Sequence, residues 1–185
     1  MALTESTMLK LGTTAPDFAL TDVVTGKVVH RGDARGQKAL LVLFICAHCP
    51  YVKHNEKGLA ALGKDYAGKG VSIVAISSND AATHPDDNPA GLKKQAQTYG
   101  FVFPYLYDET QAVAHAYKAA CTPDFFLFDS EFRLVYRGQF DSSRPGNGIP
   151  VSGEDLRAAI DAVLAGKPVP TDQRPSIGCN IKWKA

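Results

Sequence analysis

The sequence predicts an α/β fold with three layers (α/β/α), in which helices cover both faces of a central mixed sheet and a β-hairpin precedes that sheet. Two observations carry this prediction. An apolar run, a helical pattern and a second apolar run follow one another between residues 39 and 76, as in a βαβ unit with parallel strands. Residues 125–128 and 134–140 have the pattern of two strands joined by a turn at Asp129-Ser130, which adds an antiparallel pair.

The expected elements follow the hydrophobic pattern and the turn residues along the chain. Phe18 and Leu20 alternate with polar or small neighbours, and Thr25-Gly26-Lys27 supplies the turn of the N-terminal hairpin. Asp108 and Ser152 are the expected caps of two helices. After the hairpin we expect a strand at 39–45, a helix from 50 to Gly68 or Gly70, a strand at 71–76, a polar loop at 77–89, a helix at 89–99, a strand at 104–107, a helix at 108–118, strands at 125–128 and 134–140, and a helix after 152.

The length of the chain suits one domain. We expect a single domain over residues 1–185, with a mobile arm at 1–10 and a C-terminal tail at 166–185. The tail has no regular period, yet it carries two isoleucines and the only tryptophan. A free tail would expose these apolar side chains, so we expect it to pack on the domain.

Charge and composition narrow the class of partner. The net charge of +1 gives no electrostatic reason to expect nucleic acid or an acidic membrane surface. The first residues, MALTESTMLKLG, have neither the basic start and apolar core of a signal peptide nor a span that could cross a bilayer. We therefore expect a cytoplasmic protein without a membrane partner, whose partners are proteins or small-molecule oxidants. In that compartment a cysteine pair is more often catalytic, redox-sensing or metal-binding than structural.

A cysteine pair follows the most apolar stretch of the chain. Residues 39–45 contain no polar side chain, as in a central strand covered on both faces, and they lead into Cys46-Ala47-His48-Cys49. Pro50 fits the first turn of a helix. Cys46 would then lie just before a helix N-terminus, which favours a thiolate. We expect Cys46 to attack a disulfide and Cys49 to resolve the mixed disulfide.

His48 lies between the two cysteines in the sequence. An imidazole beside Cys46 can stabilise its thiolate, which stabilises the reduced form and raises the reduction potential. The alternative is an exposed loop histidine without effect on the thiols.

Three segments carry a resemblance to a known family. Cys46-Ala47-His48-Cys49 resembles the C-x-H-C motif of thioredoxin-fold oxidoreductases. The segments FICAHCPYVKHNE, CTPDFFLFD and IGCNIKW, in this order, resemble the peroxiredoxin-like, AhpC/TSA-type branch of the thioredoxin superfamily. The resemblance implies a thioredoxin-like fold and a thiol-disulfide oxidoreductase. It implies no organic cofactor, because sulfur carries the electrons.

The resemblance also gives a role to Thr122-Pro123. Thioredoxin-fold proteins place a cis-proline opposite the cysteine pair, and the matching residue here is Pro123. Thr122 would then offer its backbone to an extended substrate. The alternative is a trans proline that only starts a strand, since about 5–6% of X-Pro bonds in folded proteins are cis.

Cys121 and Cys179 are the two remaining cysteines. Cys179 can lie beside Cys121 as a second thiol pair, or at the active site beside Cys46 or Cys49, and the sequence does not choose between the connectivities. Our expectation is the pair of Cys121 and Cys179. The alternative is that both are small buried hydrophobic residues.

Two further functions stay open. A thiol peroxidase is one, because Cys49-Pro50 resembles the nucleophile of a peroxiredoxin. The chain departs from the peroxiredoxin pattern at two positions: Cys46 replaces a threonine or serine, and Val42 replaces a proline. Neither Arg133 nor Arg137 is assigned as the active-site arginine of a peroxiredoxin. A metal-binding or metal-delivery protein is the other, with Cys46 and Cys49 as ligands together with Cys121, Cys179 or a histidine. A structural zinc site would usually need a second close pair of ligands, which the sequence does not show. We expect no bound metal.

Overall fold

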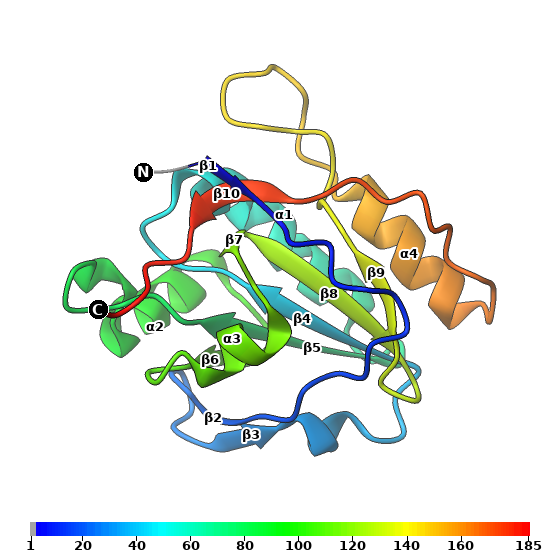
Figure 1. Cartoon of the computed structure of the whole chain (residues 1–185), viewed down its shortest axis with the longest axis horizontal. Helices are drawn as coiled ribbons and strands as arrows, with labels where there is room; N and C mark the ends of the chain where they lie inside the picture. The colour runs from blue at the N-terminus through cyan, green and yellow to red at the C-terminus, as the bar shows by residue number, and fades with distance from the viewer. Residues whose placement is uncertain (1–2) are drawn as a thin grey trace.

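The structure, a computed structural model, describes residues 3–185 (Figure 1). Its strands are β1 (Leu3–Glu5), β2 (Ala19–Asp22), β3 (Val28–His30), β4 (Ala39–Phe44), β5 (Val71–Ser77), β6 (Tyr105–Tyr107), β7 (Cys121–Thr122), β8 (Asp124–Asp129), β9 (Leu134–Arg137) and β10 (Ile177–Asn180). Its helices are α1 (Pro50–Tyr66), α2 (Pro89–Tyr99), α3 (Ala112–Tyr117) and α4 (Glu154–Leu164), with short 3-10 helices η1 (Arg31–Ala34) and η2 (Pro85–Asp87).

Helices lie on both faces of a mixed sheet. Among the described residues, seven strands form this sheet in the order β3-β2-β6-β5-β4-β8-β9, and β1-β10-β7 form a smaller sheet. The apolar sides of α1, α2 and α4 pack on one face. The other face is covered by α3, by the segment before β2 and by the end of the chain. The structure therefore has the expected three-layer fold, with β2 and β3 as the N-terminal hairpin.

β4 is the central strand because both of its faces are apolar. It pairs in parallel with β5, where Val42 is opposite Val74, and antiparallel with β8, where Val42 is opposite Phe126. Leu41 and Leu43 are fully buried in the core beneath α1, while Val42 is buried in the opposite core. This alternation is the period-two pattern of a strand, and the expected parallel βαβ unit is confirmed.

The N-terminus differs from the expected mobile arm. Residues Leu3–Glu5 form β1, which pairs antiparallel with β10. Ser6 N then donates a hydrogen bond of 2.8 Å to Ser176 O. The prediction was wrong for these residues because their partner is a strand at the far end of the chain, which no local pattern reveals. Met1 and Ala2, also part of the expected arm, lie outside the described residues.

The C-terminal tail lies against the domain. β10 is held between β1 and β7, and Ile181 after it is buried in the core on the side of α3. The ring of Trp183 stacks on that of His115, with centroids 4.1 Å apart. In Figure 1 the tail runs from α4 across the edge of the molecule to a position near α2 and α3.

Two helix starts differ from the expected caps. The N-cap of α3 is Gln111, and Asp108 instead accepts a hydrogen bond of 2.9 Å from Ala114 N with its carboxylate. The N-cap of α4 is Gly153 in a left-handed conformation, with Ser152 one residue outside the helix. Both shifts arise from turns before the helix, which sequence spacing locates only approximately.

The length and hydropathy of the helices bear on membrane insertion. Within residues 3–185, no helix combines the length and the apolar composition needed to cross a membrane.

Candidate active site

The cysteine motif lies where the central strand meets α1. Cys46 to Cys49 follow the end of β4, and α1 begins at Pro50, whose missing N–H is no loss in a first helical turn. On the neighbouring strand, Phe44 is opposite Asp124, so the start of β8 reaches the same edge. The Thr122-Pro123 peptide just before β8 is cis, as expected.

Thr122 contacts both cysteines of the motif. Its hydroxyl lies 3.4 Å from Cys46 Sγ, and its carbonyl oxygen lies 3.2 Å from Cys49 Sγ. However, Thr122 is also paired with Cys179 of β10 in the small sheet. The backbone expected to be offered to a substrate is therefore already occupied by the protein's own tail, which corrects that part of the prediction.

The favoured thiolate is on Cys49 rather than on Cys46. Cys49 is the N-cap of α1, and hydrogen bonds from Cys46, then Cys179, the Val52 N–H and Thr122 lower its pKa despite burial. Burial, then the hydrogen bond to Cys49 and the charge of Asp87, raises the pKa of Cys46. Because the helix begins at Pro50, the cap position falls on Cys49, and the attack by Cys46 expected from the sequence stays a prediction.

A buried carboxylate that the sequence did not single out organises the motif. Asp87 Oδ1 accepts hydrogen bonds from Ala47 N at 2.8 Å and His48 N at 3.0 Å. Its Oδ2 accepts from His48 Nδ1 at 2.5 Å and from Asn79 Nδ2 at 2.8 Å. These bonds lower the pKa of Asp87, although burial acts in the opposite direction. The N–H groups of the motif therefore point at Asp87 and not at Cys46.

The sequence offered only a general signal for Asp87. The polar loop after β5 lies at the carboxyl end of a parallel strand, the edge at which ligands bind in open sheets. That loop holds Asp80, Asp86 and Asp87, and sequence spacing does not separate them. Only the folded chain shows that Asp87 is buried while Asp86 is exposed.

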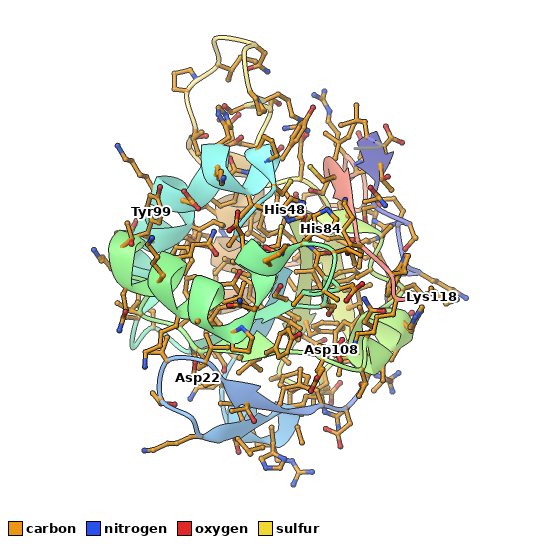
Figure 2. All side chains as sticks on the ribbon, turned by 90° about the vertical axis from the view of Figure 1, so that its left-hand side faces the viewer. Asp22, His48, His84, Tyr99, Asp108 and Lys118 are labelled. Atoms are coloured by element: carbon orange, nitrogen blue, oxygen red, sulfur yellow. The ribbon has the colours of Figure 1, made fainter. Side chains whose placement is uncertain are left out.

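His48 lies beside Cys46, but it is bonded to Asp87. Its Nδ1 is 3.7 Å from Cys46 Sγ, and the same atom makes the short contact with Asp87. Its ring packs on that of His84, with centroids 4.5 Å apart, and Figure 2 shows the two side chains together. The role of His48 in tuning the thiolate stays a prediction.

Cys179 joins the active site instead of pairing with Cys121. Cys179 Sγ lies 2.7 Å from Cys49 Sγ, whereas Cys121 Sγ contacts Pro123 O at 3.5 Å. The register explains this difference: Cys179 is opposite Thr122, so Cys121 and Cys179 project to opposite faces of the small sheet. The expected second thiol pair is therefore corrected. No disulfide joins the four cysteines, and all four are buried.

The sulfur atoms are covered by protein. Cys46 and Cys49 are 0% exposed and Cys179 is 4% exposed. A protein disulfide can reach them only after the segments around the motif move. A buried centre of this kind limits access by other thiols and oxidants.

The comparison with protein families decides the class of the protein. The model of the AhpC/TSA family matches residues 11–137. The chain belongs to the AhpC/TSA family. Its seven-stranded mixed sheet with helices on both faces is a thioredoxin-like fold, and this AhpC/TSA protein is an oxidoreductase.

Relatives of this AhpC/TSA protein have two kinds of name. The thiol-disulfide oxidoreductase ResA of Geobacillus kaustophilus is 30% identical over 126 residues, which cover 68% of this chain and 67% of that protein. Alkyl hydroperoxide reductase E of Mycobacterium tuberculosis is 30% identical over 141 residues, which cover 75% of this chain and 82% of that protein.

Two solved structures match almost the whole AhpC/TSA chain. A conserved protein from Geobacillus kaustophilus has a TM-score of 0.97 and 58% identity, covering 100% of this chain and 97% of that one. A protein from Sinorhizobium meliloti has a TM-score of 0.96 and 53% identity, covering 98% of this chain and 99% of that one. A thiol:disulfide interchange protein DsbE from Chlorobium tepidum, with a TM-score of 0.66 and 24% identity over 84% of this chain and 99% of that one, supports the fold.

The arginines considered for a peroxidase site in this AhpC/TSA protein lie elsewhere. Arg137 donates to Leu9 O at 2.8 Å and to Gln173 Oε1 at 2.7 Å. Arg133 has its Nη1 3.5 Å from Gly12 O. These hydrogen bonds anchor the N-terminal segment and the tail.

One group of side chains in the described part of this AhpC/TSA protein has the composition of a metal site. Ligand-type atoms of Cys46, His48 and Asp87 lie within 4.8 Å of one another. His48 Nδ1 and Asp87 Oδ2 already hydrogen-bond to each other, and a metal would have to separate them. These residues fit a hydrogen-bonded thiol better than a preformed metal centre.

Proposed function

We propose that the protein is a thiol-disulfide oxidoreductase whose reactive pair is Cys46 and Cys49, and that its substrates are thiols or disulfides of other proteins. The observation that carries the proposal is the position of Cys49 at the N-cap of α1, where it accepts a hydrogen bond from Cys46. Two thiols that share a hydrogen bond and favour one thiolate can form and release a disulfide.

The arrangement of charges supports a definite order of steps. Cys49 holds the thiolate and attacks the substrate disulfide, releasing the first substrate thiol. Cys46 then attacks the Cys49 sulfur of the mixed disulfide, which releases the second substrate thiol and leaves a Cys46–Cys49 disulfide. This order reverses the one expected from the sequence, because Asp87 takes the N–H groups that would otherwise stabilise a Cys46 thiolate.

Trapping with a model disulfide tests this function. A Cys46→Ser/Cys179→Ser variant, in which Cys49 has no neighbouring thiol, should accumulate a mixed disulfide at Cys49 with a reagent such as an insulin-derived peptide. Cys49→Ser should not form it, and Cys121→Ala should turn over like the wild type. Trapping at Cys46 but not at Cys49 would contradict the order of steps, and trapping at neither would contradict the exchange itself.

A peroxidase is the second candidate, and it is favoured by the likeness to alkyl hydroperoxide reductase E. The Cys49 thiolate before Pro50 is the residue that would attack a peroxide, forming a sulfenic acid that Cys46 condenses with to give the same disulfide. Consumption of hydrogen peroxide that is lost in Cys49→Ser would support this activity.

A cytoplasmic location stays a prediction.

A further inference from the structure

The tail places a third sulfur at the reactive pair. Cys179 Sγ is in direct contact with Cys49 Sγ, at 2.7 Å, although the two residues are 130 positions apart in the sequence. Cys46 also hydrogen-bonds to Cys49, so the Cys49 sulfur has one cysteine neighbour from its own motif and one from the tail.

The backbone around Cys179 is built for this close approach. A Cβ at Gly178 would lie 2.0 Å from Thr122 O, a distance that real Cβ atoms do not reach. Glycine is therefore required for β10 to lie this close to β7. Because Cys179 is opposite Thr122 in the register, its side chain shares the face from which Thr122 contacts the cysteines.

Residues after Cys179 are tied to the carboxylate that holds the motif. Lys182 N donates to Asn79 Oδ1 at 2.8 Å, and Asn79 Nδ2 donates to Asp87 Oδ2 at 2.8 Å. Gln111 Nε2 also donates to Lys182 O at 2.9 Å. The tail is thus anchored on both sides of Cys179, by strand pairing and by these side chains.

We propose that Cys179 is a third redox-active cysteine, which attacks the Cys49 sulfur of the Cys46–Cys49 disulfide. The Cys49–Cys179 bond forms, the Cys46–Cys49 bond breaks, and Cys46 leaves as a thiolate. The proton that Cys179 gives up balances the one that Cys46 takes up, so the exchange changes neither the electron count nor the proton count of the protein. The inference rests on the proposed function, because substrate exchange supplies the first disulfide.

The exchange would give the oxidised protein a second form. Cys46 becomes a thiol again beside His48 and Asp87, while β10 is bonded covalently to the start of α1. The protein then stores two oxidising equivalents in the Cys49–Cys179 bond with Cys46 reduced.

Disulfide mapping in the full-length protein tests the inference. Wild type, Cys46→Ser, Cys46→Ala, Cys49→Ser and Cys179→Ala are oxidised with glutathione disulfide, free thiols are alkylated, and peptides are identified by mass spectrometry. Cys121→Ala, a buried cysteine outside the site, is the matched control. Circular dichroism verifies that each variant is folded.

The inference predicts an intramolecular Cys49–Cys179 disulfide in both Cys46 variants, only Cys46–Cys49 in Cys179→Ala, and no intramolecular disulfide in Cys49→Ser. Two Cys46 substitutions are used so that a folding defect of one does not decide the result. If the wild type forms Cys46–Cys49 while folded Cys46 variants keep Cys49 and Cys179 free, the inference is overturned and the proposed function stands. If the wild type forms no disulfide, the proposed function fails.

Discussion

Asp87 and His48 form a buried hydrogen-bonded pair at the cysteine motif, with Oδ2 and Nδ1 2.5 Å apart. The Asp87 side chain is fully buried and that of His48 is 12% exposed. Because the same carboxylate accepts the N–H groups of Ala47 and His48, it fixes both the shape and the charge of the motif. Removing its charge without changing its shape is therefore informative.

Asp87→Asn is expected to lower the pKa of Cys46. The negative charge of Asp87 is one of the causes that raise this pKa, so its removal should shift the midpoint of thiol alkylation to lower pH. The measurement is the pH dependence of thiol alkylation at Cys46, followed by mass spectrometry. Asp86→Asn, an exposed neighbour in η2, is the control that should leave the midpoint unchanged. An upward shift in Asp87→Asn would contradict the account.

Cys49 is expected to carry a thiolate below pH 7, where an ordinary thiol with a pKa of about 8.5 is protonated. Hydrogen bonds from Cys46 and Cys179 lower its pKa. Ultraviolet absorbance of the thiolate should therefore persist on the acid side of neutrality in the wild type and in Cys46→Ser, whose hydroxyl can still donate. Cys49→Ser should lose this signal while keeping the helix, because serine is a favourable N-cap. A signal that survives in Cys49→Ser would place the thiolate elsewhere.

Gly178→Ala is expected to separate β10 from β7. The added Cβ meets the Thr122 carbonyl at 2.0 Å, so the strands must move apart, at a cost of about 1–3 kcal/mol in the free energy of unfolding. The contact between Cys179 and Cys49 should be lost, which makes Cys179 alkylation faster. Urea unfolding and alkylation rates measure the two effects. Gly32→Ala, with no atom near its Cβ position, should change neither.

The buried carboxyl group of Asp124 should make the stability of the protein depend on pH. Burial raises its pKa to about 7 from 3.8. Between these values the unfolded chain ionises first, so the native state binds more protons and stability falls as pH rises through this window. Asp124→Asn removes this penalty. The free energy of unfolding of the variant, minus that of the wild type, should therefore increase from pH 4 to pH 8 by a few kcal/mol, which is the order of magnitude that a shift of about three pKa units gives.

Urea unfolding at several pH values measures this difference. Asp172→Asn, which changes an exposed carboxylate, is the matched control. A difference between Asp124→Asn and wild type that stays constant with pH would show that Asp124 does not titrate in this window.

The central fold could be predicted from the sequence because its signals are local. The apolar run that forms β4, the proline that opens α1 and the next apolar run that forms β5 lie within a short stretch, and each pattern has few alternatives. The cysteine pair lies at the junction of β4 and α1 for the same reason. Its position follows from the order of these elements.

Other features of the site depend on contacts between distant parts of the chain. β1 has only three residues, and its partner β10 is at the opposite end of the sequence. The position of Cys179 follows from the strand register, since a shift of one residue would turn its side chain to the other face. Asp86 and Asp87 are neighbours in the same loop, and the fold buries Asp87 while it leaves Asp86 exposed.

The most direct test of the account is a redox titration of the wild-type protein in glutathione buffers, with the disulfides identified by mass spectrometry at each potential. The account predicts a reversible two-electron transition in which Cys49 is always one of the bonded residues. Thiols that stay free across the whole range of potentials, or a transition that survives in Cys49→Ser, would contradict it.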